Sequence, residues 1–421
     1  MRARTAARLL ILALLLGASL PISSTAGSAS TDLQLFQPCT ADQKYSCIEY
    51  FGVINSKGVA IAGKTVGAGR DVGPNDSFAG QNRVGLSYEW QTPGVIHENG
   101  NDRVFLKVFY FPKDLPYCYS STAPCDTGVD EIVFEVGGAW WGNQPKPIDF
   151  PGLSDNRQCG TKTAPTVCIR GWGINEDVEY VVRVRAPQNW EISHAVGEGR
   201  NGIISMSSDS QGINHLEFKA SPARRSVSYQ IISPRVVDTT TKADATWSAL
   251  NVYVQGVKSN SSQWLAKCNY ARGMSIWHNG NLQSYPSWSA SDQALSLTVE
   301  AAHLQMDGSA NVGTFNVAMP LTVANCLWNV DLSKTAQATV SASYPELGIS
   351  EIVTTSSKIT NGTYILTASG FHYSAPTIKV KVNQVKEVTK PKVTSIICVK
   401  GKIKRTVSAV RPVCPKGFVK K

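Results

Sequence analysis

The first thirty residues place the strongest constraint on what this chain can fold into. They begin with three arginines, continue with an unbroken apolar run over 9–16, and end in small residues around Ala26 and Ala29. This order is typical of a secretory signal peptide, and the apolar run is too short to cross a bilayer. We therefore expect residues 1–30 to be a signal peptide that is removed on export. The mature chain is then expected to be secreted, without a transmembrane segment, and to fold in an oxidising compartment.

The expected export determines how the cysteines are interpreted. The chain has ten cysteines, all beyond the signal peptide, and an even number is what a fully disulfide-bonded set requires. Export makes disulfides a better interpretation than a zinc site. The sequence alone does not fix the connectivity, but pairing neighbours along the chain gives one simple scheme. The five pairs of that scheme are Cys39–Cys47, Cys118–Cys125, Cys159–Cys168, Cys268–Cys326 and Cys398–Cys414.

Residues 31–235 carry the pattern of an antiparallel β domain, either a sandwich or a jelly roll. Apolar side chains occupy both faces of 103–111, which is typical of a strand in the middle of a layered structure. Residues 178–184 alternate between apolar and polar instead, as in a sheet with one solvated face. We expect further strands at 48–54, 84–90, 131–136, 167–172, 203–206, 213–219 and 226–232.

A second sandwich-like domain, Ig-like or similar, is predicted for residues 236–383. Ser233-Pro234 and three consecutive threonines mark the boundary before it, and no long helical period interrupts it. Its turn signals are Asn279-Gly280, Asp307-Gly308 and Asn361-Gly362, dipeptides that favour tight hairpins. The predicted fold class is therefore all-β, with two antiparallel β-sandwich-like domains.

Positive charge is concentrated at the end of the chain. The net charge is +10, yet residues 379–421 hold thirteen Lys and Arg against a single acid, Glu387. Residues 384–392 are predicted to be a linker, and 393–421 a small basic hairpin stapled by Cys398 and Cys414. The residues expected to bind a polyanion are Lys400, Lys402, Lys404, Arg405, Lys416, Lys420 and Lys421. The alternative is a solvated end that only improves solubility.

Three stretches support a resemblance to known sequences. The Cys398-Val399-Lys400-Gly401-Lys402 and Cys414-Pro415-Lys416-Gly417 segments resemble a short Lys-rich, two-cysteine module at the end of secreted actinobacterial proteins. The stretch from Cys326 to Val380 and the start around Cys39 and Cys47 are similar to uncharacterised exported proteins of the same group. The resemblance implies an exported actinobacterial protein and transfers no activity and no catalytic residue.

Catalytic signatures are missing from the sequence. It has no His-Glu-x-x-His, no Gly-x-Ser-x-Gly and no phosphate-binding glycine loop, and its six histidines are scattered. We therefore identify no catalytic residue, and no cofactor or metal site is expected. The acidic groups Asp130, Glu131 and Glu135, and Glu176, Asp177 and Glu179, each lie near tryptophans, so a carbohydrate-active enzyme remains the less favoured alternative.

Trp140, Trp141 and Trp172 lie in glycine-flanked segments and are candidates for stacking on sugars. The competing interpretation is that they fill the ends of the sandwich core. Taken together, the sequence predicts a secreted binding or structural protein of the cell envelope, held to an anionic cell-wall polymer or envelope surface by its basic end. Carbohydrate is a further candidate partner, and nucleic acid is not expected in that compartment.

Overall fold

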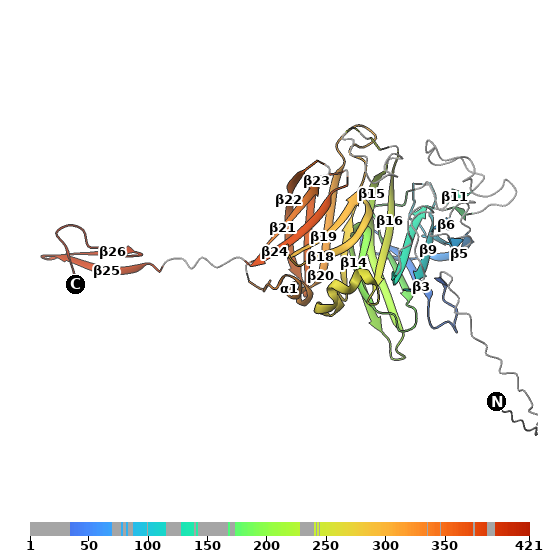
Figure 1. Ribbon diagram of the computed structural model, residues 1–421, viewed down its shortest axis with the longest axis horizontal. Coiled ribbons are helices and arrows are strands. Elements are labelled where there is room, and N and C mark those ends of the chain that lie inside the picture. The colour runs from blue at the N-terminus through green and yellow to red at the C-terminus, as the bar shows by residue number, and fades with distance from the viewer. Residues whose placement is uncertain are drawn as a thin grey trace, which may run out of the picture. The chain divides into compact units, whose positions relative to one another are not determined.

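The protein is described by a computed structural model, which is composed mainly of strands (Figure 1). The residues it describes are 34–69, 77–78, 81–82, 87–98, 100–114, 128–138, 140–141, 167–168, 173–227, 240, 242–243, 245–334, 336–345, 347–373, 375–384 and 392–421. Two helical segments lie among these residues, η3 (Asn260–Ala271) and α1 (Leu321–Trp328). The predicted all-β fold class is confirmed.

One long sheet runs through the body of the protein. All its neighbouring strands pair antiparallel except β14 and β17, which are parallel. In spatial order its strands are β5 (Lys64–Gly69), β8 (Ser87–Gln91), β9 (Arg103–Phe111), β10 (Glu131–Gly138), β16 (Ala245–Gly256), β14 (Ile192–Ser208), β17 (Met274–His278), β20 (Val312–Pro320), β23 (Thr363–His372) and β22 (Ile349–Thr360). We call this the central sheet.

Two further sheets share strands with the central sheet. The first contains β4 (Ala60–Ala62), β3 (Cys47–Ile54), β13 (Glu179–Arg185) and β15 (Asn214–Val227), and β15 pairs with the second half of β14. The second contains β18 (Asn281–Ser289), β19 (Ala294–Glu300), β24 (Thr377–Gln384) and β21 (Ala336–Tyr344), and β21 pairs with the first half of β22. Strand β14 therefore connects the first of these sheets to the central sheet, and strand β22 connects the second.

Six short strands complete the body over the described residues. β1 (Gln34–Leu35) pairs with β9, and β2 (Gln37–Pro38) lies parallel to β3. β6 (Ser77–Phe78) pairs with β7 (Gln81–Asn82), and β11 (Trp140–Trp141) pairs with β12 (Val167–Cys168).

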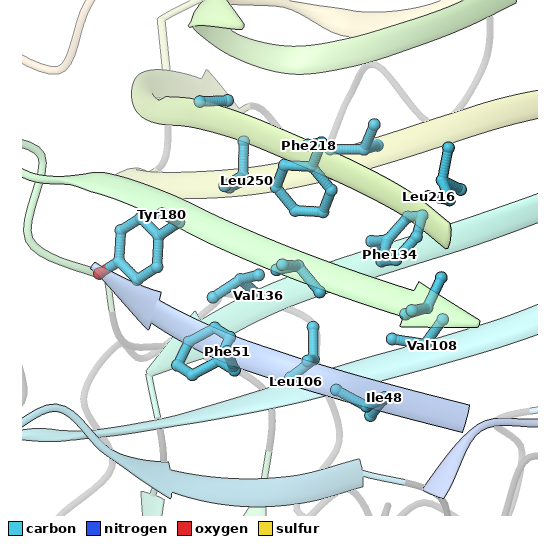
Figure 2. Close-up of a cluster of buried hydrophobic side chains, with 14 of the residues drawn as sticks. Ile48, Phe51, Leu106, Val108, Phe134, Val136, Tyr180, Leu216, Phe218 and Leu250 are labelled. Atoms are coloured by element: carbon cyan, nitrogen blue, oxygen red, sulfur yellow. The ribbon is translucent and has the colours of Figure 1, made fainter. Parts of the chain in front are cut away.

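The first hydrophobic core lies between the central sheet and the β3–β13–β15 sheet. Figure 2 shows its aromatic centre, where Phe134 and Phe218 meet edge to face with ring centroids 5.0 Å apart. Aliphatic side chains from β9 and β10 fill the space between the aromatic rings. The core extends past residue 235, because Leu250, Val254 and Trp277 also belong to it.

The second core lies between the far half of the central sheet and the β18–β19–β24–β21 sheet. β17 serves both cores, since Ile276 packs in the second and Trp277 in the first. Adjacent residues of a strand point to opposite faces, so the two cores lie on opposite faces of the central sheet at β17. β9 is also buried on both faces, as its sequence predicts, with Phe109 and Phe111 in a small third cluster.

The disulfides support the predicted pairing where the structure describes it. Cys39–Cys47, Cys268–Cys326 and Cys398–Cys414 are bonded. The remaining two pairs, Cys118–Cys125 and Cys159–Cys168, involve positions outside the described residues.

The three expected turns have different outcomes. Asn361-Gly362 closes the β22–β23 hairpin with both residues at positive φ, and Asp307-Gly308 forms a local turn between Gln305 and Ser309. The hairpin expected at Asn279-Gly280 is wrong: β17 and β18, which flank it, do not pair with each other. Gly280 is needed there for close packing, since a Cβ would lie 2.8 Å from the ring of Tyr373.

Candidate functional site

The basic end of the chain folds as a three-stranded antiparallel sheet, which we call the C-terminal sheet. β25 (Thr394–Lys400) and β26 (Ile403–Ala409) form the expected hairpin. A third strand, β27 (Val419–Lys420), pairs with the other edge of β25, and the sequence did not predict it. Because β27 returns to β25, the last residues of the chain are fixed against the hairpin.

Local features of the sequence explain this fold. Gly401 adopts a positive φ in the β25–β26 turn, and Gly417 does so before β27, a conformation that glycine adopts without steric cost. Cys398 is fully buried and bonds to Cys414, which ties the 410–418 segment to the sheet. The guanidinium of Arg405 lies 5.5 Å from the ring centroid of Phe418. A disulfide and a cation–π contact therefore take the place of a hydrophobic core that a unit of this size cannot build.

The C-terminal sheet carries a uniform positive charge. Residues 392–421 contain no Asp or Glu. All their cations are exposed, namely Lys392, Lys400, Lys402, Lys404, Arg405, Arg411, Lys416, Lys420 and Lys421. None of them forms a salt bridge with another described residue. Lys392 and Arg411 join the seven cations that the sequence singled out. The unit therefore presents positive charge that is free to meet an external anion.

The tryptophans proposed to bind sugar lie in a part that is described only in outline. Trp140 and Trp141 form β11, where Trp140 pairs with Cys168 and Trp141 with Val167. Their side chains, and the whole of Trp172, lie outside the described residues. The sugar-binding interpretation thus stays a prediction.

The acidic residues of β10 lie inside the protein. Asp130 is buried and accepts a hydrogen bond of 2.8 Å from the Tyr110 hydroxyl, and Glu131 is fully buried. Glu135 pairs with Lys107 at 3.4 Å. In the second acidic group, Glu176 lies 3.4 Å from Arg224 and 4.0 Å from Arg200. Asp130 and Glu131 therefore do not face solvent, where a substrate would have to reach them.

Glu131 belongs to a row of polar side chains across the central sheet. Gln255 lies opposite Glu131 on one side and opposite His194 on the other. Glu131 Oε1 accepts hydrogen bonds from Gln255 Nε2 and from the Tyr285 hydroxyl of β18, while Oε2 has no partner among the described residues. Burial raises the pKa of Glu131 to about 8, against the opposing effect of the two hydrogen bonds. Burial also lowers the pKa of His194 to about 3. Both groups are therefore neutral at pH 7.

A second polar cluster lies beside the Cys39–Cys47 loop. A cleft of about 450 Å³ there is lined partly by Lys44, Arg185 and Asp209. His215 bridges Glu49 at 2.7 Å through Nδ1 and Asp209 at 3.3 Å through Nε2. Both ring nitrogens of His215 are therefore engaged by carboxylates of the protein itself. The cluster connects β3, β15 and the 209–213 turn.

The described ranges contain neither a metal-binding cluster nor a membrane-spanning helix. No group of three or more His, Cys, Asp or Glu side chains there could hold a metal ion. Neither η3 nor α1 has the length and apolar character needed to span a bilayer.

Comparison of the chain with protein-family models, with curated protein sequences and with solved structures finds no match.

Proposed function

We propose that this is a secreted protein of the cell envelope, with a binding or structural role, whose C-terminal sheet holds it to an anionic surface. The observation that supports this proposal most is the charge of residues 392–421, where nine exposed cations stand without one acidic side chain. Disulfides such as Cys268–Cys326 fit an oxidising compartment. The signal-like start of the chain fits export.

The disulfide-bonded fold supports a role in binding. β25, β26 and β27 hold the cations on a fixed framework, so fewer conformations are lost on contact with a polyanion than for an unstructured tail. Attraction between exposed charges is screened by salt. Binding should therefore be strong at low ionic strength and weaken as salt is added.

The experiment compares two full-length variants with the same change in net charge. One is K400Q/K402Q/K404Q/K420Q in the C-terminal sheet, and the other is K57Q/K64Q/K334Q/K358Q on the body, where all four lysines are also exposed. Each protein is pelleted with purified bacterial cell walls at about 50 mM and about 500 mM NaCl, on either side of physiological screening.

We expect the C-terminal variant to bind at least about tenfold more weakly at low salt, because each cation near an anionic surface contributes on the order of 1 kcal/mol. The body variant should bind as the unmodified protein does. Equal loss in both variants would show that overall charge, not the C-terminal sheet, is responsible. Unchanged binding of both would reject the proposed function.

A further inference from the structure

The C-terminal sheet has two chemically different faces. Residues opposite each other in an antiparallel pair share a face, so the strand register shows on which of the two faces each side chain lies. The closed face contains Cys398, Arg405 and Lys420. The face opposite, which we call the open face, contains Ile397, Val399, Thr406, Lys404 and Val419.

The fold needs only the closed face. Cys398 is buried there, and the 410–418 segment lies against it through Cys414 and Phe418. On the open face, Ile397 is 46% exposed and Val419 is 69% exposed, with Val399 between them in the register. The open face therefore has an aliphatic stripe across β25 and β27, in which Ile397 and Val419 are exposed and Val399 is half-buried.

Cations border this stripe. Lys404 lies opposite Val399 on β26, and the backbone N–H of Lys421 donates to Ile397 O beside Val419. Lys402 occupies the β25–β26 turn. Aliphatic side chains ringed by cations match the boundary of an anionic bilayer, where the apolar groups enter the headgroup region and the cations contact lipid phosphates. A soluble polyanion would leave the aliphatic stripe in water.

We propose that the open face of the C-terminal sheet docks on the surface of an anionic lipid bilayer, with Ile397, Val399 and Val419 entering the headgroup region. This inference rests on the proposed function and names the surface that the cations recognise. It adds an apolar contribution to binding, and salt does not screen that contribution. The strength of binding at a bilayer surface increases with both the apolar area that is buried and the electrostatic attraction to anionic lipids, and the open face offers both.

The experiment uses the full-length protein and vesicles of phosphatidylcholine alone or with about one third phosphatidylglycerol, which supplies the anionic surface. The test variant is I397S/V419S. Its matched control is I403S/V413S, which removes an isoleucine and a valine that are 57% and 78% exposed but lie outside the open face. Circular dichroism and thiol titration establish that each variant is folded and disulfide-bonded.

We expect the unmodified protein and I403S/V413S to bind only the anionic vesicles and to retain part of that binding at about 500 mM NaCl, where charge is screened. At high salt, I397S/V419S should bind the anionic vesicles at least about tenfold more weakly than the unmodified protein does. A second variant, V419K, adds a cation while removing an aliphatic group. Weaker high-salt binding by V419K supports insertion, and stronger binding overturns it.

Other outcomes separate this inference from the proposed function. If I397S/V419S binds anionic vesicles as I403S/V413S does, the open face does not insert, whether or not the cell-wall assay succeeds. If the protein pellets with cell walls but ignores anionic vesicles, the partner is a wall polymer and the lipid proposal fails while the proposed function stands. If I397S/V419S changes the hydrodynamic radius of the free protein, the open face docks on the rest of the chain, which also overturns the proposal.

Discussion

Glu198 and Arg225 form a 2.8 Å ion pair between two buried side chains. Glu198 also accepts hydrogen bonds from Asn251 Nδ2 at 2.7 Å and from the backbone N–H of Leu282 at 3.0 Å. The carboxylate thus connects β14 and β16, which carry the first core, to β18, which covers the second. A charged group buried at this junction is stable only while each of its partners is present.

The first prediction concerns this ion pair. R225M leaves the Glu198 carboxylate buried without its cation, and we expect the free energy of unfolding to fall by about 3–5 kcal/mol. The control is K334M, which removes the exposed Lys334–Asp331 pair and should leave stability unchanged. Urea unfolding followed by tryptophan fluorescence measures both. Equal midpoints for R225M and K334M would contradict the assigned role of the pair.

The second prediction concerns the pH dependence that Glu131 imposes. Its pKa is about 8 in the folded protein, above the ordinary value of 4.5. Between these values the folded state holds a proton that the unfolded chain has released. The free energy of unfolding therefore falls as pH rises through this window, by up to about 1.4 kcal/mol per pH unit from this group.

E131Q removes this dependence, so the stability of E131Q relative to the unmodified protein should increase from pH 5 toward pH 8. E217Q is a control whose stability should change with pH in the opposite direction. Burial tends to raise the pKa of Glu217, but hydrogen bonds from Arg183 and Lys219 outweigh it and lower the pKa. E217Q should be less stable than the unmodified protein at neutral pH, with the difference fading in acid. Parallel pH profiles for E131Q and the unmodified protein would show that Glu131 is ionised inside the fold.

The third prediction compares two disulfides with different loop lengths. Cys268 and Cys326 are 58 residues apart and connect η3 to α1, whereas Cys39 and Cys47 are 8 apart. Chain entropy predicts a stabilisation of about 4 kcal/mol for the longer loop and about 2.5 kcal/mol for the shorter one. C268A/C326A should therefore unfold at a lower urea concentration than C39A/C47A. The reverse order would mean that native-state contacts at the short loop dominate.

The sequence predicted the regular strands well because alternation is a local property. β9 has the predicted bounds, and β3 and β13 lie within one residue of theirs. β14 was expected only over 203–206, yet it begins at Ile192. Its first half, with Ser193, Gly197 and Glu198, has no clear alternation, and it is a strand because β16 and β17 pair with it from both sides.

The turn at Asn279-Gly280 shows the same limit. The dipeptide marks a bend between β17 and β18, but the partner of each flanking strand depends on distant residues. Asn279 Oδ1 accepts hydrogen bonds from the Thr314 backbone N–H and the Tyr373 hydroxyl, which hold it against β20. No pattern local to residues 274–289 contains that information.

The sequence predicted the positive charge of the candidate site but not which side chains share a face. The cations can be read directly from the sequence, which singled out seven of the nine. The open face was missed because Ile396, Ile397, Cys398 and Val399 are consecutive apolar residues, so sequence alone does not show which of them face solvent. Register with β26 and β27 assigns Ile397 and Val399 to the open face.

The last prediction concerns the contact between β14 and β17, the strand that packs in both cores. Gly197 of β14 lies opposite Trp277 of β17, and a Cβ at Gly197 would be 2.1 Å from the indole ring. Trp277 is buried and packed in the first core, so the ring has no free space to move into. We expect G197A to lower the free energy of unfolding by about 3 kcal/mol. G67A, on the exposed part of β5 where a Cβ meets nothing within 4 Å, should have little effect.

The double variant G197A/W277L tests whether the clash is the cause. In a W277L background the smaller side chain leaves room for the added methyl group, so G197A should cost much less there than in the unmodified protein. The difference between the two backgrounds is the interaction energy of a double-mutant cycle, and urea unfolding of the four proteins measures it. If G197A costs the same in both backgrounds, Gly197 is required for its backbone rather than for the space it leaves to Trp277. In that case the close contact of β14 and β17 would not explain why glycine occupies this position.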